Sequence, residues 1–270
     1  MGKLGVAEDE AMVMMFAGGV GLIRWLYYYV RLVQPRAGKA SAGVRFPVFL
    51  APFVAMGALW IVLRQLASFD VREDPVYLFF YLVLGTAWTA AATWLPALLG
   101  ISYRDDVAER GNAGAAWAIA GAILGASLVF TGANIGDWPG WWVVFYTGGA
   151  ALGLFAGCWL VLELVTGISE TITVDRDTSA GIRLGALLLA NGCILGRAAA
   201  GNWHGPEQAV QQVMQVGIAA VVLTIVAVVV ERILKPTPAN PRQPLGAGVL
   251  TAVVYLGIAG AWISLMGWWT

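Results

Sequence analysis

The chain has 270 residues, of which 59% are hydrophobic and 12% are charged. Soluble domains carry about 25% charged residues, so this chain has an excess of apolar residues, which is expected to face lipid. Basic and acidic residues are equal in number, and a net charge of zero gives no overall field that would attract nucleic acid.

Eight apolar runs are long enough to cross a bilayer, which takes roughly 20 residues. In chain order they cover about 11–31, 46–66, 76–100, 113–135, 141–166, 179–200, 209–230 and 246–268. Only short polar links join them, and no link could hold a soluble domain. The sequence therefore predicts an all-α integral membrane protein of about eight transmembrane helices, with residues 1–270 forming a single membrane domain.

Lys and Arg are unequally shared between the two sets of links. The links after the first, third, fifth and seventh runs hold eleven basic residues and the opposite side holds four, with Arg24 inside the first run left unassigned. The side richer in Lys and Arg is usually cytoplasmic. We therefore expect both termini outside, in a bacterial inner membrane.

The even-numbered runs open alike. Ser41-Ala-Gly-Val-Arg45 matches Ser179-Ala-Gly-Ile-Arg183, and the four openings start at residues 39, 112, 177 and 244, at spacings of 73, 65 and 67. This pattern predicts four tandem helix hairpins, about 11–70, 76–138, 141–203 and 209–268, in a parallel repeat about an axis along the membrane normal. The alternative is that Ala-Gly starts are simply common in membrane helices.

Small residues follow these openings at one-turn spacing. They are Gly121 and Gly125 in the fourth run, Gly149, Gly153 and Gly157 in the fifth, and Gly181, Gly185, Gly192 and Gly196 in the sixth. Such stripes let helix backbones approach closely. We expect them to pack helices rather than to bind a ligand, with Asn112 and Asp177 capping the helices that they precede.

Residues 76–203 resemble the YjfL-like membrane protein family, known as domain of unknown function 350. The resemblance rests on Gly111-Asn112-Ala-Gly-Ala-Ala116 with its glycines, and on the second copy that begins at Asp177, where the family has Asn. It implies four helices in two hairpins, a bacterial inner membrane and a setting near membrane-stress proteins, but no reaction. Residues 1–70 and 204–270 would then be extra hairpins on either side.

Polar side chains inside the runs are the candidates for a functional site: Arg24, Glu163, Asn191, Arg197 and Glu231. Intramembrane charges are costly and usually face the protein interior. Glu163, Arg197 and Glu231 lie near helix ends, where snorkelling explains them, whereas Arg24 would need a partner, and an ion pair to an acid such as Glu163 would supply one. Asn191 is expected to bond a neighbouring helix, with a pore-lining role as the alternative.

Chemistry at a cofactor or metal is not indicated. The single His204 and the two distant cysteines, Cys158 and Cys193, make neither a haem site nor a zinc set. No nucleotide loop, nucleophile elbow or metalloprotease signature is present. We therefore expect a protein that is not an enzyme and holds no cofactor.

Two functions remain open on the sequence. The first is a scaffold in envelope or membrane-stress homeostasis, whose partners are the lipid bilayer, a peripheral cytoplasmic protein and a second copy of the chain. The second is an ion channel or small-solute transporter with a path near the repeat axis. A transporter needs a wet path lined by residues such as Asn191, Arg24 or Glu163, whereas a scaffold needs only tight packing.

Overall fold

The structure is a computed structural model that describes residues 7–33, 41–235 and 243–267, and within these ranges it holds helices and no strand. Eight helices are long and apolar enough to cross a membrane. They are α1 (Glu8–Val33), α2 (Ala42–Gln65), α4 (Pro75–Ala92, continued by α5, Leu95–Leu98), α6 (Ala113–Ala133), α7 (Trp141–Thr166), α9 (Thr178–Ala199), α10 (Pro206–Ile233) and α11 (Leu245–Leu265). The predicted all-α membrane fold with eight transmembrane helices is confirmed.

The third span differs from its prediction as one unbroken helix to residue 100. α4 ends at Ala92, and α5 follows as a single turn. Pro96 explains the break, because it has no N–H to donate to the carbonyl of Ala92 one turn earlier. Three further short segments lie in the links: α3 (Phe69–Glu73), the π-helical segment η1 (Tyr103–Glu109) and α8 (Ile168–Thr173).

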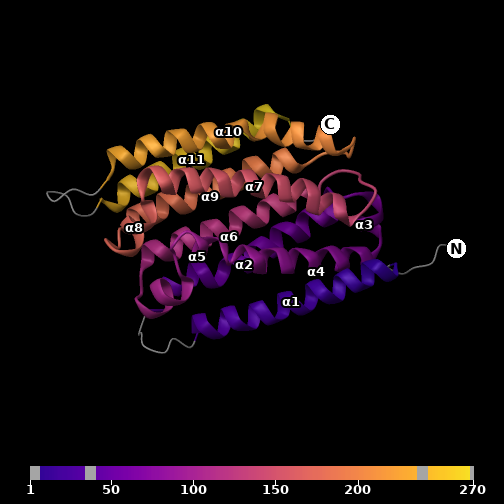
Figure 1. The fold of residues 1–270 in the computed structure, drawn as a ribbon, viewed down its shortest axis with the longest axis horizontal. Helices are drawn as coiled ribbons and strands as arrows, with labels where there is room; N and C mark the ends of the chain where they lie inside the picture. The colour runs from indigo at the N-terminus through magenta and orange to yellow at the C-terminus, as the bar shows by residue number, and fades with distance from the viewer. Residues whose placement is uncertain (1–6, 34–40, 236–242, 268–270) are drawn as a thin grey trace.

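The long helices lie side by side, from α1 at one edge to α10 and α11 at the other (Figure 1). In one layer α2, α6, α9 and α11 are consecutive neighbours. In the other layer α4 packs against α2 and α6, α7 against α6 and α9, and α10 against α9, while α1 packs on α4. The two central helices, α6 and α9, are mostly buried, whereas α1 and α11 are mostly exposed and apolar, as lipid-facing helices are.

The centre of the row is a contact between the backbones of α6 and α9, the largest contact in the fold. A Cβ added at Gly121 would collide with the carbonyl of Gly185, and one at Gly192 with the backbone of Gly125. A Cβ at Gly181 would likewise meet the backbone of Gly114. These glycines are therefore used as expected, to bring two helices together without intervening side chains.

The glycines of α7 behave differently from the prediction. Cβ atoms at Gly149, Gly153 and Gly157 would have nothing within 4 Å. The stripe therefore does not pack against a helix among the described residues, and the expectation of tight packing was wrong for α7. α7 turns its larger residues, such as Phe155 and Trp159, inward instead, where they contribute the van der Waals packing that drives helix association in a bilayer.

The starts of α6 and α9 have the same local structure, 177 − 112 = 65 residues apart. Asn112 accepts a hydrogen bond from the N–H of Ala115, and Asp177 caps α9 in the same way, with φ of −79° and −75° at the two cap residues. The residue before each cap has positive φ, +66° at Gly111 and +55° at Arg176. Arg176 is the only non-glycine described with positive φ, a conformation that disfavours side chains.

Each of these caps also holds the segment that follows it one hairpin later. The Asn112 amide donates to the carbonyl of Ile172 at 2.7 Å, and the Asp177 carboxylate accepts from the N–H of Gln243 at 3.3 Å. At the other end of the bundle, the N–H of Gly136 donates to the carbonyl of Leu66 at 3.3 Å, and the N–H of Gly201 donates to the carbonyl of Ile135 at 2.9 Å. Consecutive hairpins are therefore joined at both ends.

Both α1 and α11 have their free ends on the same side of the molecule (Figure 1). Glu10 in the first turn of α1 accepts a hydrogen bond from Tyr77 at the start of α4. Arg197 near the end of α9 donates to the carbonyl of Gly267, just after α11. An even number of spans requires this arrangement; that this side is the outside remains a prediction from the Lys and Arg distribution.

Candidate functional site

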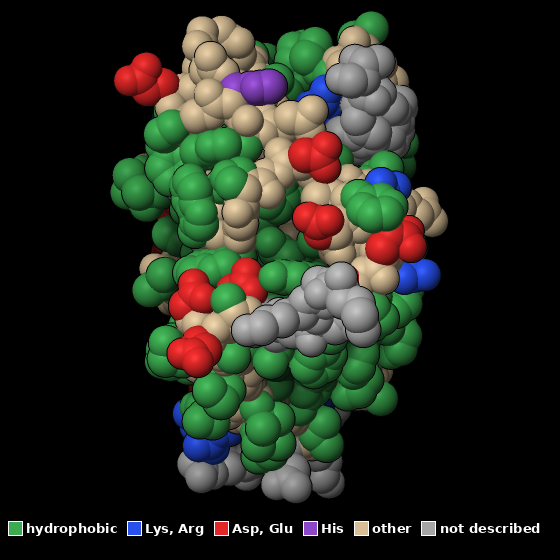
Figure 2. All heavy atoms as spheres, turned by 90° about the vertical axis from the view of Figure 1, so that its right-hand side faces the viewer, with side chains coloured by type: hydrophobic (Ala, Val, Ile, Leu, Met, Phe, Trp, Pro, Cys, Tyr) green, Lys and Arg blue, Asp and Glu red, His purple; other side chains and the backbone are tan. Residues whose placement is uncertain are grey.

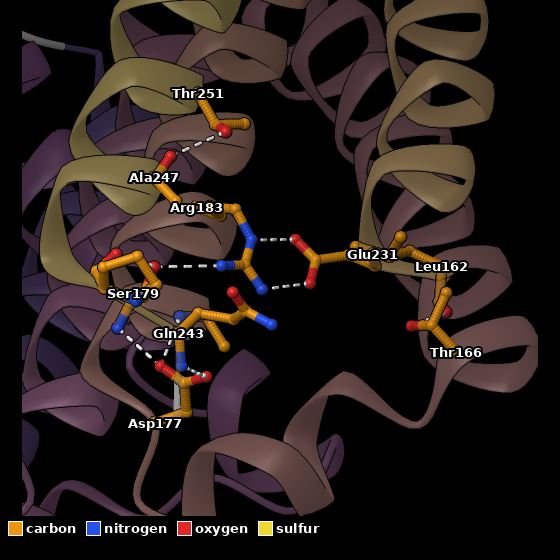
Figure 3. Close-up of polar contacts among 11 residues, drawn as sticks. Leu162, Thr166, Asp177, Ser179, Arg183, Glu231, Gln243, Ala247 and Thr251 are labelled. Atoms are coloured by element: carbon orange, nitrogen blue, oxygen red, sulfur yellow. Dashed lines mark hydrogen bonds and ion pairs between the residues drawn. The ribbon is translucent and has the colours of Figure 1, made fainter. Parts of the chain in front are cut away.

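Two buried charges of opposite sign form an ion pair between α9 and α10. Arg183 is 1% exposed and Glu231 is 7% exposed. The guanidinium donates two parallel hydrogen bonds to the carboxylate, at 2.7 and 2.6 Å, and a third to the Ser179 hydroxyl at 3.0 Å (Figure 3). This fork-to-fork geometry is the strongest form of ion pair, and it neutralises both charges inside the bundle.

Asn191 lies further along the same face of α9. Its amide donates to the Thr224 hydroxyl of α10 at 3.1 Å, and that hydroxyl donates to the carbonyl of Ala220 one turn earlier. The Asn191 side-chain oxygen is buried and has no partner. A bond between neighbouring helices is what an amide at this depth was expected to form.

The two contacts together make a polar seam, which we define as Ser179, Arg183, Asn191, Thr224 and Glu231. Arg183 and Asn191 are eight residues apart, about 12 Å along α9. The seam lies on the α10 side of α9, whereas the glycine contact occupies the α6 side. The polar groups are therefore beside the central helix pair, not between its members.

Arg24 is 9% exposed and has a different environment from the one predicted. Its Nε donates to the Thr93 hydroxyl at 2.9 Å and its Nη1 to the Tyr103 hydroxyl at 3.3 Å. The rings of Trp94, Tyr27 and Tyr103 lie 5.0 to 5.6 Å from the guanidinium carbon. Cation–π attraction and two neutral acceptors thus surround a charge that meets no carboxylate.

The suggested ion pair of Arg24 with Glu163 was therefore wrong. The Glu163 carboxylate instead accepts hydrogen bonds from the N–H and hydroxyl of Ser169. Gly167 makes this local contact geometrically easy, because it ends α7 in the left-handed conformation, with φ of +64°, and turns the chain back. Glu163 thus closes the α7–α8 corner and is not part of the polar seam.

Arg197 and His204 belong to the end of the bundle that carries the free ends of α1 and α11. Arg197 donates to the carbonyls of Met266 and Gly267. Arg197, His204 and Gln212 line a hollow of about 380 Å³. Figure 2 looks onto this end and shows several acidic side chains spread over it, with the histidine exposed at one edge of the view.

Sequence reasoning missed the partner relation between Arg183 and Glu231. Arg183 was assigned to a basic link and Glu231 to a snorkelling position near a helix end. The two are 48 residues apart, so their pairing depends on α10 packing against α9. A usable signal was that Arg183 lies in the second turn of one span and Glu231 in the last turn of the next, so antiparallel spans bring them to a similar depth. No group of three or more His, Cys, Asp or Glu in the described ranges could hold a metal ion.

A scan against protein-family models matches one family, described as Domain of Unknown Function (DUF350), over residues 134–266. Residues 134–266 belong to the DUF350 family. The DUF350 segment holds α7, α9, α10 and α11, so it contains the whole polar seam. No curated protein and no solved structure matches the chain.

The DUF350 match lies later in the chain than the resemblance suggested. The predicted core was 76–203, so the two ranges share residues 134–203. The matched segment still has the expected size of two hairpins, but they are the third and fourth rather than the second and third. In this arrangement α1, α2, α4 and α6 all precede the DUF350 segment.

Proposed function

We propose that this protein is a non-enzymatic scaffold of the bacterial inner membrane that docks a peripheral protein in envelope homeostasis. The observation that carries the proposal is the backbone contact of α6 with α9. Because two helices touch through their glycines at the centre of the row, no room is left between them for ions or solutes. A tightly packed row of helices suits a platform better than a conduit.

The docking surface we propose is the end of the bundle that holds η1 and α8. Mixed charges gather there in short segments: Arg104 lies 3.6 and 3.4 Å from the carboxylates of Asp105 and Glu109, and Arg110 lies 3.2 Å from Asp106. Arg104 and Arg110 remain partly exposed in these pairs. Surface pairs of this kind add little stability and can exchange partners, which suits recognition of a charged protein surface.

The test is co-purification of the tagged full chain from mild detergent, with Arg104→Glu and Arg110→Glu compared with Arg64→Glu. Arg64 is an exposed arginine at the opposite end, where it donates to the carbonyl of Arg72. We expect one defined protein to bind the parent and the Arg64 variant but to be lost from the two others. Equal recovery from all four would contradict docking at η1.

The repeat proposed from sequence supports the same function. The matching caps at Asn112 and Asp177, with positive φ before each, favour hairpins that arose as tandem copies. Helices related in this way present equivalent turns side by side at one end of the row. A second copy of the chain could extend such a row, so self-association belongs to the proposal.

A channel or small-solute transporter is the second candidate, and the polar seam is the observation that favours it. Intramembrane polar groups commonly mark ion or substrate pathways, and Asn191 keeps a buried oxygen without a partner. The test is flux of common ions into liposomes that hold the purified protein, with Asn191→Ala beside the parent. Flux that changes in the variant at equal protein level would support a path along the seam, and no flux in the parent would remove it.

A further inference from the structure

We infer that Arg24 and Arg31 bind the head group of an anionic phospholipid, with Arg24 on its phosphate, at the lateral surface formed by α1, α5 and η1. We call this surface the Arg24 patch and define it by Arg24, Tyr27, Arg31, Trp94 and Tyr103. The inference is independent of the docking function proposed for the end of the bundle, because it concerns a side of the protein that faces lipid.

The first argument is charge balance. Every Asp and Glu of the sequence lies within the described residues, and none is within 4.0 Å of the Arg24 or Arg31 guanidinium. The contrast with Arg183 is direct, since that other buried arginine has a carboxylate at 2.6 Å. A charge held inside a membrane span without a counter-ion is costly, so an anion from the surroundings would stabilise it.

The second argument is the number of unused donors. A guanidinium has five N–H donors, and Arg24 directs hydrogen bonds to two acceptors, the hydroxyls of Thr93 and Tyr103. Burial raises the pKa of the Tyr103 phenol, so this hydroxyl is neutral at physiological pH and does not compensate the charge. The remaining N–H donors have the planar geometry that binds phosphate oxygens in pairs.

The third argument is access. Trp94 is 49% exposed, Tyr27 is 45% exposed and Leu98 of α5 is 77% exposed. Apolar and aromatic side chains therefore flank Arg24 on the outside of the bundle, as they do where a membrane protein meets the head-group region. An ion dissolved in water would have to pass this apolar rim, whereas a lipid phosphate arrives with its own acyl chains against it.

The fourth argument is a second cation in reach. Arg31 lies two turns after Arg24 on α1, about 10 Å along the axis. The guanidinium groups of both residues lie close to the Tyr27 ring, at 5.6 and 5.1 Å from its centroid. Basic pockets between helices on the side richer in Lys and Arg are typical sites for anionic head groups. Arg24 would hold the phosphate, and Arg31 would face the outer part of the head group.

The experiment is native mass spectrometry of the full chain in mild detergent, with phosphatidylglycerol or phosphatidylcholine added at equal concentration. We expect the parent to retain phosphatidylglycerol preferentially. One basic group near the membrane contributes about a fivefold change in lipid affinity, so Arg24→Gln and Arg31→Gln should each retain about fivefold less. Arg64 lies in the last turn of α2, at the other end of the bundle, so Arg64→Gln should retain as much phosphatidylglycerol as the parent.

Two comparisons keep the inference open to refutation. If Arg24→Gln does not fold, Arg31→Gln carries the test, because Arg31 is only partly buried near the end of α1. Inorganic phosphate is added in a separate series and is expected not to displace phosphatidylglycerol. Equal retention of both lipids by the parent, unchanged retention by Arg31→Gln, or displacement by inorganic phosphate would each overturn the lipid assignment.

Discussion

Replacing Arg183 alone should change the free energy of unfolding by more than replacing Arg183 and Glu231 together. Arg183→Met leaves the Glu231 carboxylate buried without its partner, so we expect a loss of about 3–5 kcal/mol in the free energy of unfolding. In the double variant Arg183→Met, Glu231→Met no charge is left buried, and most of the loss should be recovered. Unfolding of the purified protein in detergent measures both.

The control for this pair is Arg232→Met, which changes the neighbouring arginine on α10. Arg232 is exposed and donates only to a carbonyl, that of Val165 at 3.4 Å. Its replacement should change the free energy of unfolding by less than about 1 kcal/mol. A double variant that is as unstable as Arg183→Met alone would show that the pair does more than neutralise itself.

Asp106 in η1 makes stability depend on pH in a defined direction. Burial raises the pKa of its carboxyl above the usual value, although the Ser102 N–H and Arg110 oppose this. The folded protein therefore keeps the proton at pH values where the unfolded chain has lost it. The stability that Asp106 contributes to the folded protein is fully present below the ordinary pKa of Asp, and it is lost as pH rises through the raised pKa.

Asp106→Asn removes that proton equilibrium. We expect the melting temperature of the parent, relative to the variant, to be higher at pH 4 than at pH 7. Asp105→Asn is the matched control, since the side chain of Asp105 is 52% exposed, and its difference from the parent should show no such dependence. A parent that gains stability relative to Asp106→Asn as pH rises would contradict the assignment.

The residue-scale features differ in how far the sequence predicts them. Asn112 and Asp177 were predicted as caps because a cap acts within its own first turn. The partners of Arg24, Arg183 and Asn191 could not be read in this way, since they lie 69, 48 and 33 residues away. Spacing along one helix says which face a side chain shares, but not which helix covers that face.

Glycine stripes separate into two kinds at the scale of the helix, and a matched pair of substitutions tests this. Gly185→Ala in α9 should lower the free energy of unfolding by about 1–3 kcal/mol, because the new Cβ would collide with the carbonyl of Trp117. Gly153→Ala in α7 meets nothing within 4 Å and should be neutral or stabilising by up to about 1 kcal/mol. Thermal unfolding in the same detergent compares the two.

If both alanine variants melt alike, the close approach of α6 and α9 is contradicted. The sequence alone does not distinguish these stripes, because both have glycine at one-turn spacing. What separates them is the rest of each helix. α9 is lined by small residues on more than one side, whereas α7 has Phe155 and Trp159 to bury and turns its glycines away.

The orientation of the whole molecule is open to a direct test. Cysteines at Arg104 and Ser169 should be blocked from an impermeant thiol reagent added outside, because these positions lie on the side richer in Lys and Arg. Cysteines at Asp137 and Glu207, at the opposite end of the bundle, should react. The two native cysteines lie inside α7 and α9 and are removed first. The reverse labelling pattern would invert the topology.

The number of spans was predictable because bilayer thickness fixes the length of an apolar run. The arrangement of the spans was less so, since every helix offers an apolar surface to lipid and to protein alike. Contact between α6 and α9 follows from their shared glycines, but that of α10 with α9 depends on Arg183 meeting Glu231 and on Asn191 meeting Thr224. A single sequence marks these polar residues as unusual within apolar spans, but it does not say which of them form pairs.

The joining of each hairpin to the next bears on how the protein is made. α6 finds its principal partner in α9, whose cap lies 65 residues after its own. A ribosome adds roughly 5–20 residues per second, so the glycine face of α6 would wait for about 3–13 s in the bilayer before α9 arrives. During synthesis that bare face is the part of the chain most open to a wrong partner, and an insertion chaperone that shields small-residue surfaces would act at this interval.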